Sequence, residues 1–173
     1  MHNQQADAER FIPQIHARMN IRLELIMPLI KERLAVGETV RFTTHGISML
    51  PLLRNGKDQV LLAPLPEKLK KYDLPLYQRE DGSYVLHRIV KVGETFTCIG
   101  DNQYTVERGV RPEWMIGLAV GVCRKGKMIS VDGLGYKVYV RVWHWIRPVR
   151  RVMFFVCRFG RAIMRRMKRV FGK

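Results

Sequence analysis

Cysteine is scarce in this sequence, and its pattern excludes two classes of structure. Cys98, Cys123 and Cys157 are the three cysteines, they are widely spaced, and none forms a Cys-x-x-Cys pair. An odd and scattered set predicts neither a disulfide framework nor a zinc site. We expect buried or idle thiols in a reducing compartment, because free cysteine commonly packs as a small hydrophobic residue. Nothing in the sequence calls for a metal or a cofactor.

Long hydrophobic runs are also missing. No uncharged apolar run, the one at 152–157 included, approaches the roughly 20 residues that span a bilayer. The first twenty residues are polar and lack the apolar stretch of a secretory signal peptide. We therefore expect a cytoplasmic protein without a membrane span, peripheral at the cytoplasmic face of the membrane.

Acidic residues are missing from one part of the chain. Residues 136–173 hold 12 Lys and Arg and no acid, whereas residues 1–135 hold 19 basic and 15 acidic residues. Such asymmetry marks a segment with its own partner or surface. We divide the chain into a polar lead (1–22), a domain (23–135) and a basic tail (136–173).

The tail has the pattern of an amphipathic helix. Its apolar positions recur at helical spacing at Val149, Val152, Met153, Val156, Ile163, Met167 and Val170. Its aromatic residues are Trp143, Trp145, Phe154, Phe155 and Phe171. A basic helix with one apolar face favours an anionic membrane surface as partner. Nucleic acid is the weaker alternative, and a helix packed on its own domain or on another protein is the third.

Short strands separated by turn residues dominate the domain. Alternating or apolar segments predict strands over 38–44, 58–63, 74–79, 84–92, 95–99, 114–122 and 127–131. Turn signals lie at 80–83, 92–94 and 124–126. Before the strands, residues 28–37 predict a short helix with Pro28 in its first turn and Gly37 at its end. The predicted class is mostly β (α+β), as an antiparallel sheet or a partly closed barrel.

Ser48 is the candidate nucleophile. It follows the first predicted strand in a turn where Gly46 permits close approach or a positive φ and Pro51 stiffens the exit. Ser48 and nearby amides can thus be presented to a ligand, with Gly46 and Met49 as candidate oxyanion or substrate-binding positions. An ordinary turn serine is the alternative.

His87 is the candidate base that a serine nucleophile needs at neutral pH. In a continuous strand it shares a face with Val85 and Ile89, so its imidazole requires a polar partner. A core histidine bonded to a carbonyl is the alternative. Asp101 and Glu107 are both candidates for the acid that orients the imidazole, and Asp101 can instead cap its own loop.

These residues occur in an ordered motif set. It comprises Gly46-Ile47-Ser48-Met49-Leu50-Pro51, then Asp58–Leu62, His87-Arg88-Ile89-Val90 and Gly100-Asp101-Asn102. This set resembles that of signal peptidase I and the LexA-like autoproteases over roughly residues 39–131. The resemblance implies a signal-peptidase/LexA-like β-barrel core and a serine-peptidase activity on a peptide or protein substrate.

The base distinguishes branches of that family. Bacterial signal peptidases and LexA-like proteins use lysine where this chain has His87, and the histidine form resembles the branch of the endoplasmic reticulum, archaea and sporulating bacteria, known as Ser-His-Asp enzymes. Two acids usually follow the Gly-Asp-Asn motif in that branch, whereas this chain has Val106 and Glu107.

Three hypotheses on function follow. The first is a serine endopeptidase acting near the membrane surface. The second is a weak or inactive peptide-binding module of the same fold. The third is a nucleic-acid-associated, self-cleaving regulator, although the first forty residues are too short for a helix-turn-helix reader.

Overall fold

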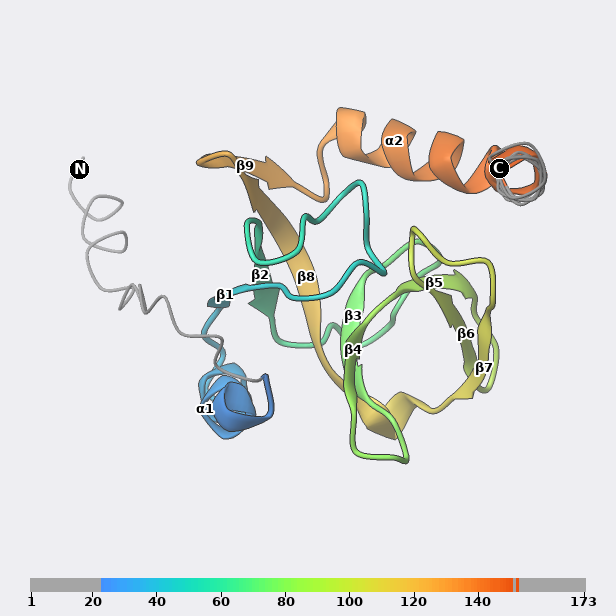
Figure 1. Ribbon diagram of the computed structural model, residues 1–173. Helices are drawn as coiled ribbons and strands as arrows, with labels where there is room; N and C mark the ends of the chain where they lie inside the picture. Colours follow the sequence, from blue (N-terminus) through green and yellow to red (C-terminus); the bar gives the residue numbers. More distant parts are fainter. Residues whose placement is uncertain (1–22, 151, 153–173) are drawn as a thin grey trace, which may run out of the picture.

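A computed structural model describes residues 23–150 and 152 (Figure 1). Its helices are α1 (Leu23–Ala35), the 3-10 turn η1 (Pro112–Trp114) and α2 (Leu134–Trp145). Its strands are β1 (Val40–Thr43), β2 (Gln59–Ala63), β3 (Pro75–Gln78), β4 (Tyr84–Leu86), β5 (Arg88–Lys91), β6 (Phe96–Ile99), β7 (Glu107–Val110), β8 (Met115–Arg124) and β9 (Lys127–Ser130). The prediction of a mostly β, α+β class is confirmed.

The strands form two antiparallel sheets. The larger has the order β1-β2-β8-β3-β4, with β9 also paired to β8, and the smaller has the order β5-β6-β7. β8 shifts register against β2 at Leu61/Leu62 and against β3 at Leu76/Tyr77. Such irregularities bend and twist a strand, and Figure 1 shows the larger sheet curled into a half-barrel. β1 and β4 lie at the two ends of this strand order.

Two apolar clusters fill the interior. The larger joins α1, the big sheet, the loop after β1 and α2, through residues such as Ile30, Leu62 and Val140. Gly117 of β8 lies where a Cβ would come within 2.9 Å of the Leu34 and Leu62 side chains, so its lack of a side chain lets α1 approach the sheet. The smaller cluster lies beside the three-stranded sheet and contains Tyr77, Ile89, Phe96, Cys98, Val110 and Met115.

The first helix differs from its prediction at one end. Gly37 ends the helical segment with φ +84°, as expected of glycine. Pro28, however, lies inside α1 and not in its first turn. Pro28 is exposed, whereas Met27, Ile30 and Leu34 are buried. Packing of this buried face offsets the backbone hydrogen bond that proline cannot donate.

The predicted strand over 84–92 is two strands. β4 pairs with β3 in the larger sheet, β5 pairs with β6 in the smaller one, and His87 is the residue between them. A single strand was predicted because no glycine or proline marks the break. A further strand, β7, begins at Glu107, where the sequence predicted a loop.

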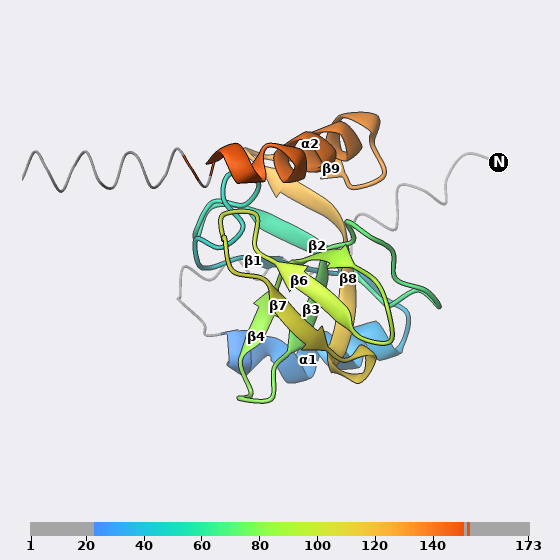
Figure 2. The ribbon, with the colours of Figure 1, turned by 90° about the vertical axis from the view of Figure 1, so that its right-hand side faces the viewer.

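The start of the predicted tail packs on the domain. Tyr136 and Val140 of α2 are buried in the larger cluster, and Figures 1 and 2 place α2 and α1 at opposite ends of the molecule. Within the described residues, no helix combines the length and the apolar character needed to cross a membrane. The polar lead (1–22), residue 151 and the tail positions 153–173 lie outside the described residues.

Candidate functional site

Ser48 lies in the long loop that connects β1 to β2. The loop ends are tied together by Thr44 N–H to Asp58 O (3.1 Å) and Gly56 N–H to Thr44 O (2.9 Å). Gly46 has φ +101°, a conformation that disfavours residues with a Cβ, and its amide donates to Asn55 Oδ1 at 2.8 Å. The loop is therefore a closed unit that presents Ser48 from a fixed base.

A buried ion pair secures the end of this loop. Asp58 is fully buried and accepts three side-chain hydrogen bonds from Arg54, two from Nε (2.9 and 3.2 Å) and one from Nη2 (2.6 Å), and one from the Arg54 amide at 2.8 Å. These hydrogen bonds outweigh burial and lower the pKa of Asp58. Arg124 of β8 also donates to Pro51 O at 2.9 Å. The part of the loop that follows Ser48 is thus anchored at Pro51 and at Asp58.

The Gly100-Asp101-Asn102 segment clamps Ser48 from the other sheet. Asn102 donates from its amide to Ser48 O (2.8 Å) and from its side chain to Ile47 O (3.2 Å). A Cβ on Gly100 would lie 2.6 Å from Ser48 O and 3.0 Å from Ser48 Cβ. Glycine is required here because the loop and the end of β6 are in direct contact.

His87 adjoins the same glycine. The β5–β6 register pairs Arg88 with Ile99, so His87 and Gly100 are the next residues along their two chains. Ser48 and His87, far apart in the sequence, therefore both neighbour Gly100. Two sequence-predicted residues are brought to one place by the pairing of β5 with β6.

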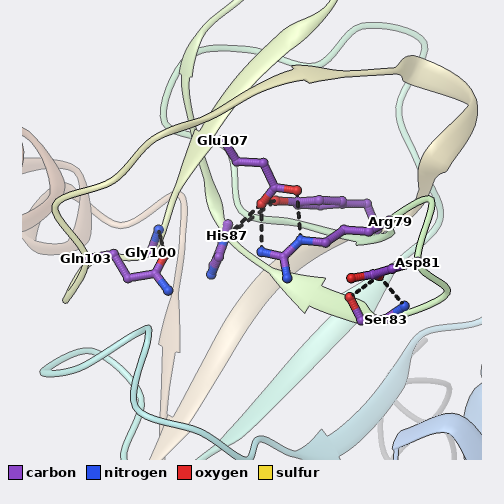
Figure 3. A network of polar contacts seen from close by, with 8 residues as sticks. Arg79, Asp81, Ser83, His87, Gly100, Gln103 and Glu107 are labelled. Atoms are coloured by element: carbon purple, nitrogen blue, oxygen red, sulfur yellow. Dashed lines mark hydrogen bonds and ion pairs between the residues drawn. The ribbon is translucent and has the colours of Figure 1, made fainter.

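Glu107 is the acid that faces His87. Its Oε2 lies 3.6 Å from His87 Nδ1 and accepts a hydrogen bond from the Tyr77 hydroxyl at 2.8 Å. Arg79 donates two hydrogen bonds of 2.8 Å to the same carboxylate (Figure 3). Burial opposes ionisation of Glu107, but the hydrogen bonds from Arg79 and Tyr77 outweigh it and lower its pKa. Glu107 is therefore a carboxylate at neutral pH.

The hydrogen bonds fix the tautomer of His87. The one proton of the Tyr77 hydroxyl goes to Glu107, so the Tyr77 oxygen, 3.4 Å from His87 Nδ1, is an acceptor toward the ring. Both neighbours of Nδ1 are thus acceptors, which assigns the ring proton to Nδ1 and the lone pair to Nε2. His87 is only 2% exposed. Burial, assisted by the charge of Arg79, lowers its pKa to about 4 despite the opposing effect of Glu107.

The Nε2 atom of His87 has no hydrogen-bond partner within the described part of the chain. A buried polar atom without a partner is costly and is uncommon outside functional sites. The Ser48 hydroxyl does not fill this role in the structure, although the Ser48 loop is packed against Gly100. His87 is thus a buried neutral base whose acceptor nitrogen is unused among the described residues.

Asp101 bonds to Arg88 and makes no hydrogen bond to His87 among the described residues. Its carboxylate accepts two hydrogen bonds of 2.8 Å from the buried Arg88 guanidinium, which also donates to Tyr72 O and to the Tyr136 hydroxyl at 3.0 Å each. The Asp101 carbonyl accepts from Trp143 Nε1 at 2.8 Å. Of the two predicted acids, Asp101 joins Arg88 to α2, and Glu107 faces His87.

The candidate oxyanion positions differ from one another. The Gly46 amide is occupied by Asn55 and cannot donate to a substrate. Met49 has a buried side chain, and among residues 23–150 and 152 the Ser48 and Met49 amides donate to no protein acceptor. Ser48 and Met49 are therefore the amides of this turn that can serve an oxyanion, and Gly46 contributes its conformation.

A cleft of about 560 Å³ opens beside Ser48, between the two ends of the larger sheet. One wall consists of 42–44 at the end of β1, the other of β4, and α1 contributes Leu23 and Ile26. The lining is mainly apolar, with Met49, Leu53 and Leu76 among its residues. The cleft separates two strands that each pair on one side only.

Sequence reasoning did not identify Tyr77 and Arg79 as site residues. Both lie on or just after β3 and reach Glu107, which lies about thirty residues further along the chain. The only local signal near them was the predicted hairpin turn at 80–83. That turn pairs β3 with β4, and His87 directly follows β4. No group of three or more His, Cys, Asp or Glu suited to a metal occurs among the described residues.

Comparison of the chain with protein-family models, with curated proteins and with solved structures gives no match.

Proposed function

We propose that this protein is a serine endopeptidase in which Ser48 is the nucleophile, His87 the general base and Glu107 the acid that orients His87. The observation that carries the proposal is the state of the His87 ring, which is neutral, faces Glu107 through Nδ1 and has an unpartnered, buried Nε2. A base-activated nucleophile requires a neutral lone pair within reach of its hydroxyl. His87 supplies the lone pair, and the position of Ser48 and His87 on either side of Gly100 supports their proximity.

In the proposed reaction, Ser48 Oγ bonds to the carbonyl carbon while its proton passes to His87 Nε2. The C–N bond then breaks, and the leaving amine takes that proton. Water loses a proton to the same nitrogen as it attacks the acyl-serine, and collapse of that intermediate returns the proton to Ser48. The amides of Ser48 and Met49 would stabilise the oxyanion, each contributing on the order of 10²–10³ in rate.

The cleft suggests the form of the substrate. β1 and β4 each have one unpaired edge toward it, and an extended peptide can add to such edges through main-chain hydrogen bonds. The mainly apolar lining favours apolar side chains at the peptide positions that enter the cleft. We therefore propose an extended segment of a peptide or protein as substrate.

The finer fold belongs to the same proposal. A curled antiparallel half-barrel and the meeting of the 46–51, 87–88 and 100–102 motifs around Gly100 support a signal-peptidase/LexA-like core. Within that resemblance the chain would be a histidine-base variant with Glu107 in place of an aspartate. Histidine suits the position because it is neutral there without the large pKa reduction that a lysine base needs.

A peptide-binding module with little or no catalysis is the second candidate. The observation that favours it is the missing hydrogen bond between the Ser48 hydroxyl and His87 Nε2. The endopeptidase proposal requires Ser48 to meet His87 once a peptide occupies the cleft, which is compatible with the looser geometry of ligand-free sites.

Labelling by a fluorophosphonate probe separates the two candidates. We expect wild-type protein and a Ser130→Ala control to be labelled, Ser48→Ala to be unlabelled, and His87→Gln to lose most of the labelling. Ser130 is a matched control because it is an exposed serine on β9, away from the cleft. Absence of labelling in wild type, with anionic vesicles present as well as without them, would contradict the enzyme and leave the binding module.

A further inference from the structure

One face of α2 is anchored on the domain. Tyr136 and Val140 are buried in the larger cluster, and Trp143 Nε1 donates to Asp101 O at 2.8 Å. Arg150, beyond the helix, stacks 3.6 Å from the Trp143 ring and also donates to Asp101 O, at 3.2 Å. The inner face of α2 is therefore occupied by contacts with the domain.

The opposite face of α2 is apolar and exposed, and exposed apolar residues continue into the helical segment after Ile146. Large apolar residues recur every three or four positions and are each at least half exposed; they are Leu134, Val138, Val142, Trp145, Val149 and Val152. Within α2, residues at this spacing lie on one side of the helix; Val149 and Val152 belong to the helical segment that follows the turn at Ile146. We call this set the outer stripe. Trp145, at 81% exposure, is the most exposed of its members.

The border of the outer stripe is cationic. Lys137 and Arg141 are exposed on α2, and residues 134–152 contain no acidic residue; Lys137 also lies 3.4 Å from the exposed carboxylate of Asp132, just before the helix. The β8–β9 hairpin, with Lys125 and Lys127 exposed, lies at the same end of the molecule as α2 in Figures 1 and 2. Apolar surface bordered by positive charge is complementary to an anionic bilayer surface.

Other occupants fit this surface less well. Two copies of the outer stripe would bring two acid-free basic helices together in a protein of net charge +16, which opposes self-association. A nucleic acid would leave the valines of the stripe unused, because such interfaces are polar. We propose that the outer stripe of α2 binds the surface of a bilayer that contains anionic phospholipid, with Trp145 at the interface.

This docking would place the candidate site close to the bilayer. The Asp101 carbonyl that receives Trp143 and Arg150 is followed by Asn102, which donates to Ser48 O. The helix that binds the membrane thus holds the segment that clamps Ser48. The substrate would then be a peptide segment at the membrane surface, an inference that rests on the proposed function.

Vesicle co-sedimentation tests the docking with the full chain. We expect wild type to sediment with phosphatidylcholine vesicles that contain phosphatidylglycerol, and not with phosphatidylcholine alone. Val138→Ser, Val142→Ser and Trp145→Ser together should weaken binding by about tenfold or more. The matched control, Leu25→Ser, Leu29→Ser and Val36→Ser together, alters exposed apolar residues of α1 and of the turn directly after it, and should bind as wild type does. Far-ultraviolet circular dichroism checks that both triple variants remain folded.

Three outcomes would overturn the docking proposal. The first is an equal loss of vesicle binding in the two triple variants, and the second is unchanged binding in the α2 variant. The third is wild-type protein that does not bind vesicles and instead forms a dimer in solution, when only the α2 variant abolishes that dimer. Ser48→Ala should bind vesicles like wild type. A failure of docking is thereby distinguished from a failure of the proposed peptidase, which the fluorophosphonate probe reports.

Discussion

His87 and Arg88 are adjacent in the chain, yet they represent opposite solutions to the burial of a polar side chain. Arg88 is 2% exposed and donates to Asp101, Tyr72 and Tyr136. His87 is equally buried, but its Nε2 has no partner in the described residues, and its acid, Glu107, is 3.6 Å from Nδ1. The first arrangement is satisfied internally and holds elements together. The second keeps an acceptor available.

The largest expected effect is that of replacing His87, the residue with the available acceptor. His87→Gln keeps the size and polarity of the side chain but removes the base. If Ser48 depends on His87, the rate of fluorophosphonate labelling should fall about 10⁴–10⁶-fold, the range of losses when a member of a catalytic triad is removed. Measurement of the labelling rate constant checks this, and the melting temperature of the variant serves as its folding control. An unchanged rate would remove His87 from the mechanism.

Changes to the Arg88–Asp101 ion pair should instead lower the stability of the domain. Asp101→Asn leaves the buried Arg88 without its negative partner, and we expect the free energy of unfolding to fall by about 3–5 kcal/mol. Because Arg88 also bonds Tyr136 of α2, chemical denaturation should show the loss in the whole domain. The double variant Arg88→Met, Asp101→Leu should recover much of it, since no lone charge remains buried. Equal losses in the two variants would contradict this account.

The motifs around Ser48 could be predicted from the sequence, but the acid that faces His87 could not. The motifs at 46–51 and 100–102 were recognisable because turns depend on glycine, proline and asparagine at particular positions, and in the structure Gly100 and Asn102 lie against Ser48. The choice between Asp101 and Glu107 could not be made, because it depends on the break at His87, which assigns β4 and β5 to different sheets. No residue type marks that break.

Tertiary context also decided the features that were missed. Pro28 was predicted in the first turn of a helix from its local preference, but the buried face of Met27, Ile30 and Leu34 places it inside α1. Tyr77 and Arg79 carry no local signal of a site, because their role depends on the position of Glu107 on a strand of the other sheet.

The depressed pKa of His87 provides a smaller effect that is measurable as stability. Its pKa of about 4 lies below the ordinary value of 6.5 expected in the unfolded chain. Between these values the unfolded state binds more protons, so the His87 contribution to the free energy of unfolding rises by about 3 kcal/mol from pH 4 to pH 6.5. Urea denaturation at several pH values should show a steeper increase in wild type than in His87→Gln. Parallel curves would mean that His87 is not buried as a neutral ring.

The smallest expected effect is that of the acid facing His87. Glu107→Gln keeps an acceptor for Tyr77 but removes the charge that favours protonated His87, so the labelling rate should fall about 10–100-fold. Glu107 raises the pKa of His87. The acidic limb of the pH–rate profile, where activity falls as His87 gains a proton near pH 4, should therefore move to still lower pH in the variant.

Arg79→Gln separates this role from packing, because it removes the guanidinium that bonds Glu107 and lowers the pKa of His87. The Arg79 variant should move the same limb to higher pH. A shift in the same direction in both variants would mean that Glu107 acts on His87 through local structure and not through its charge.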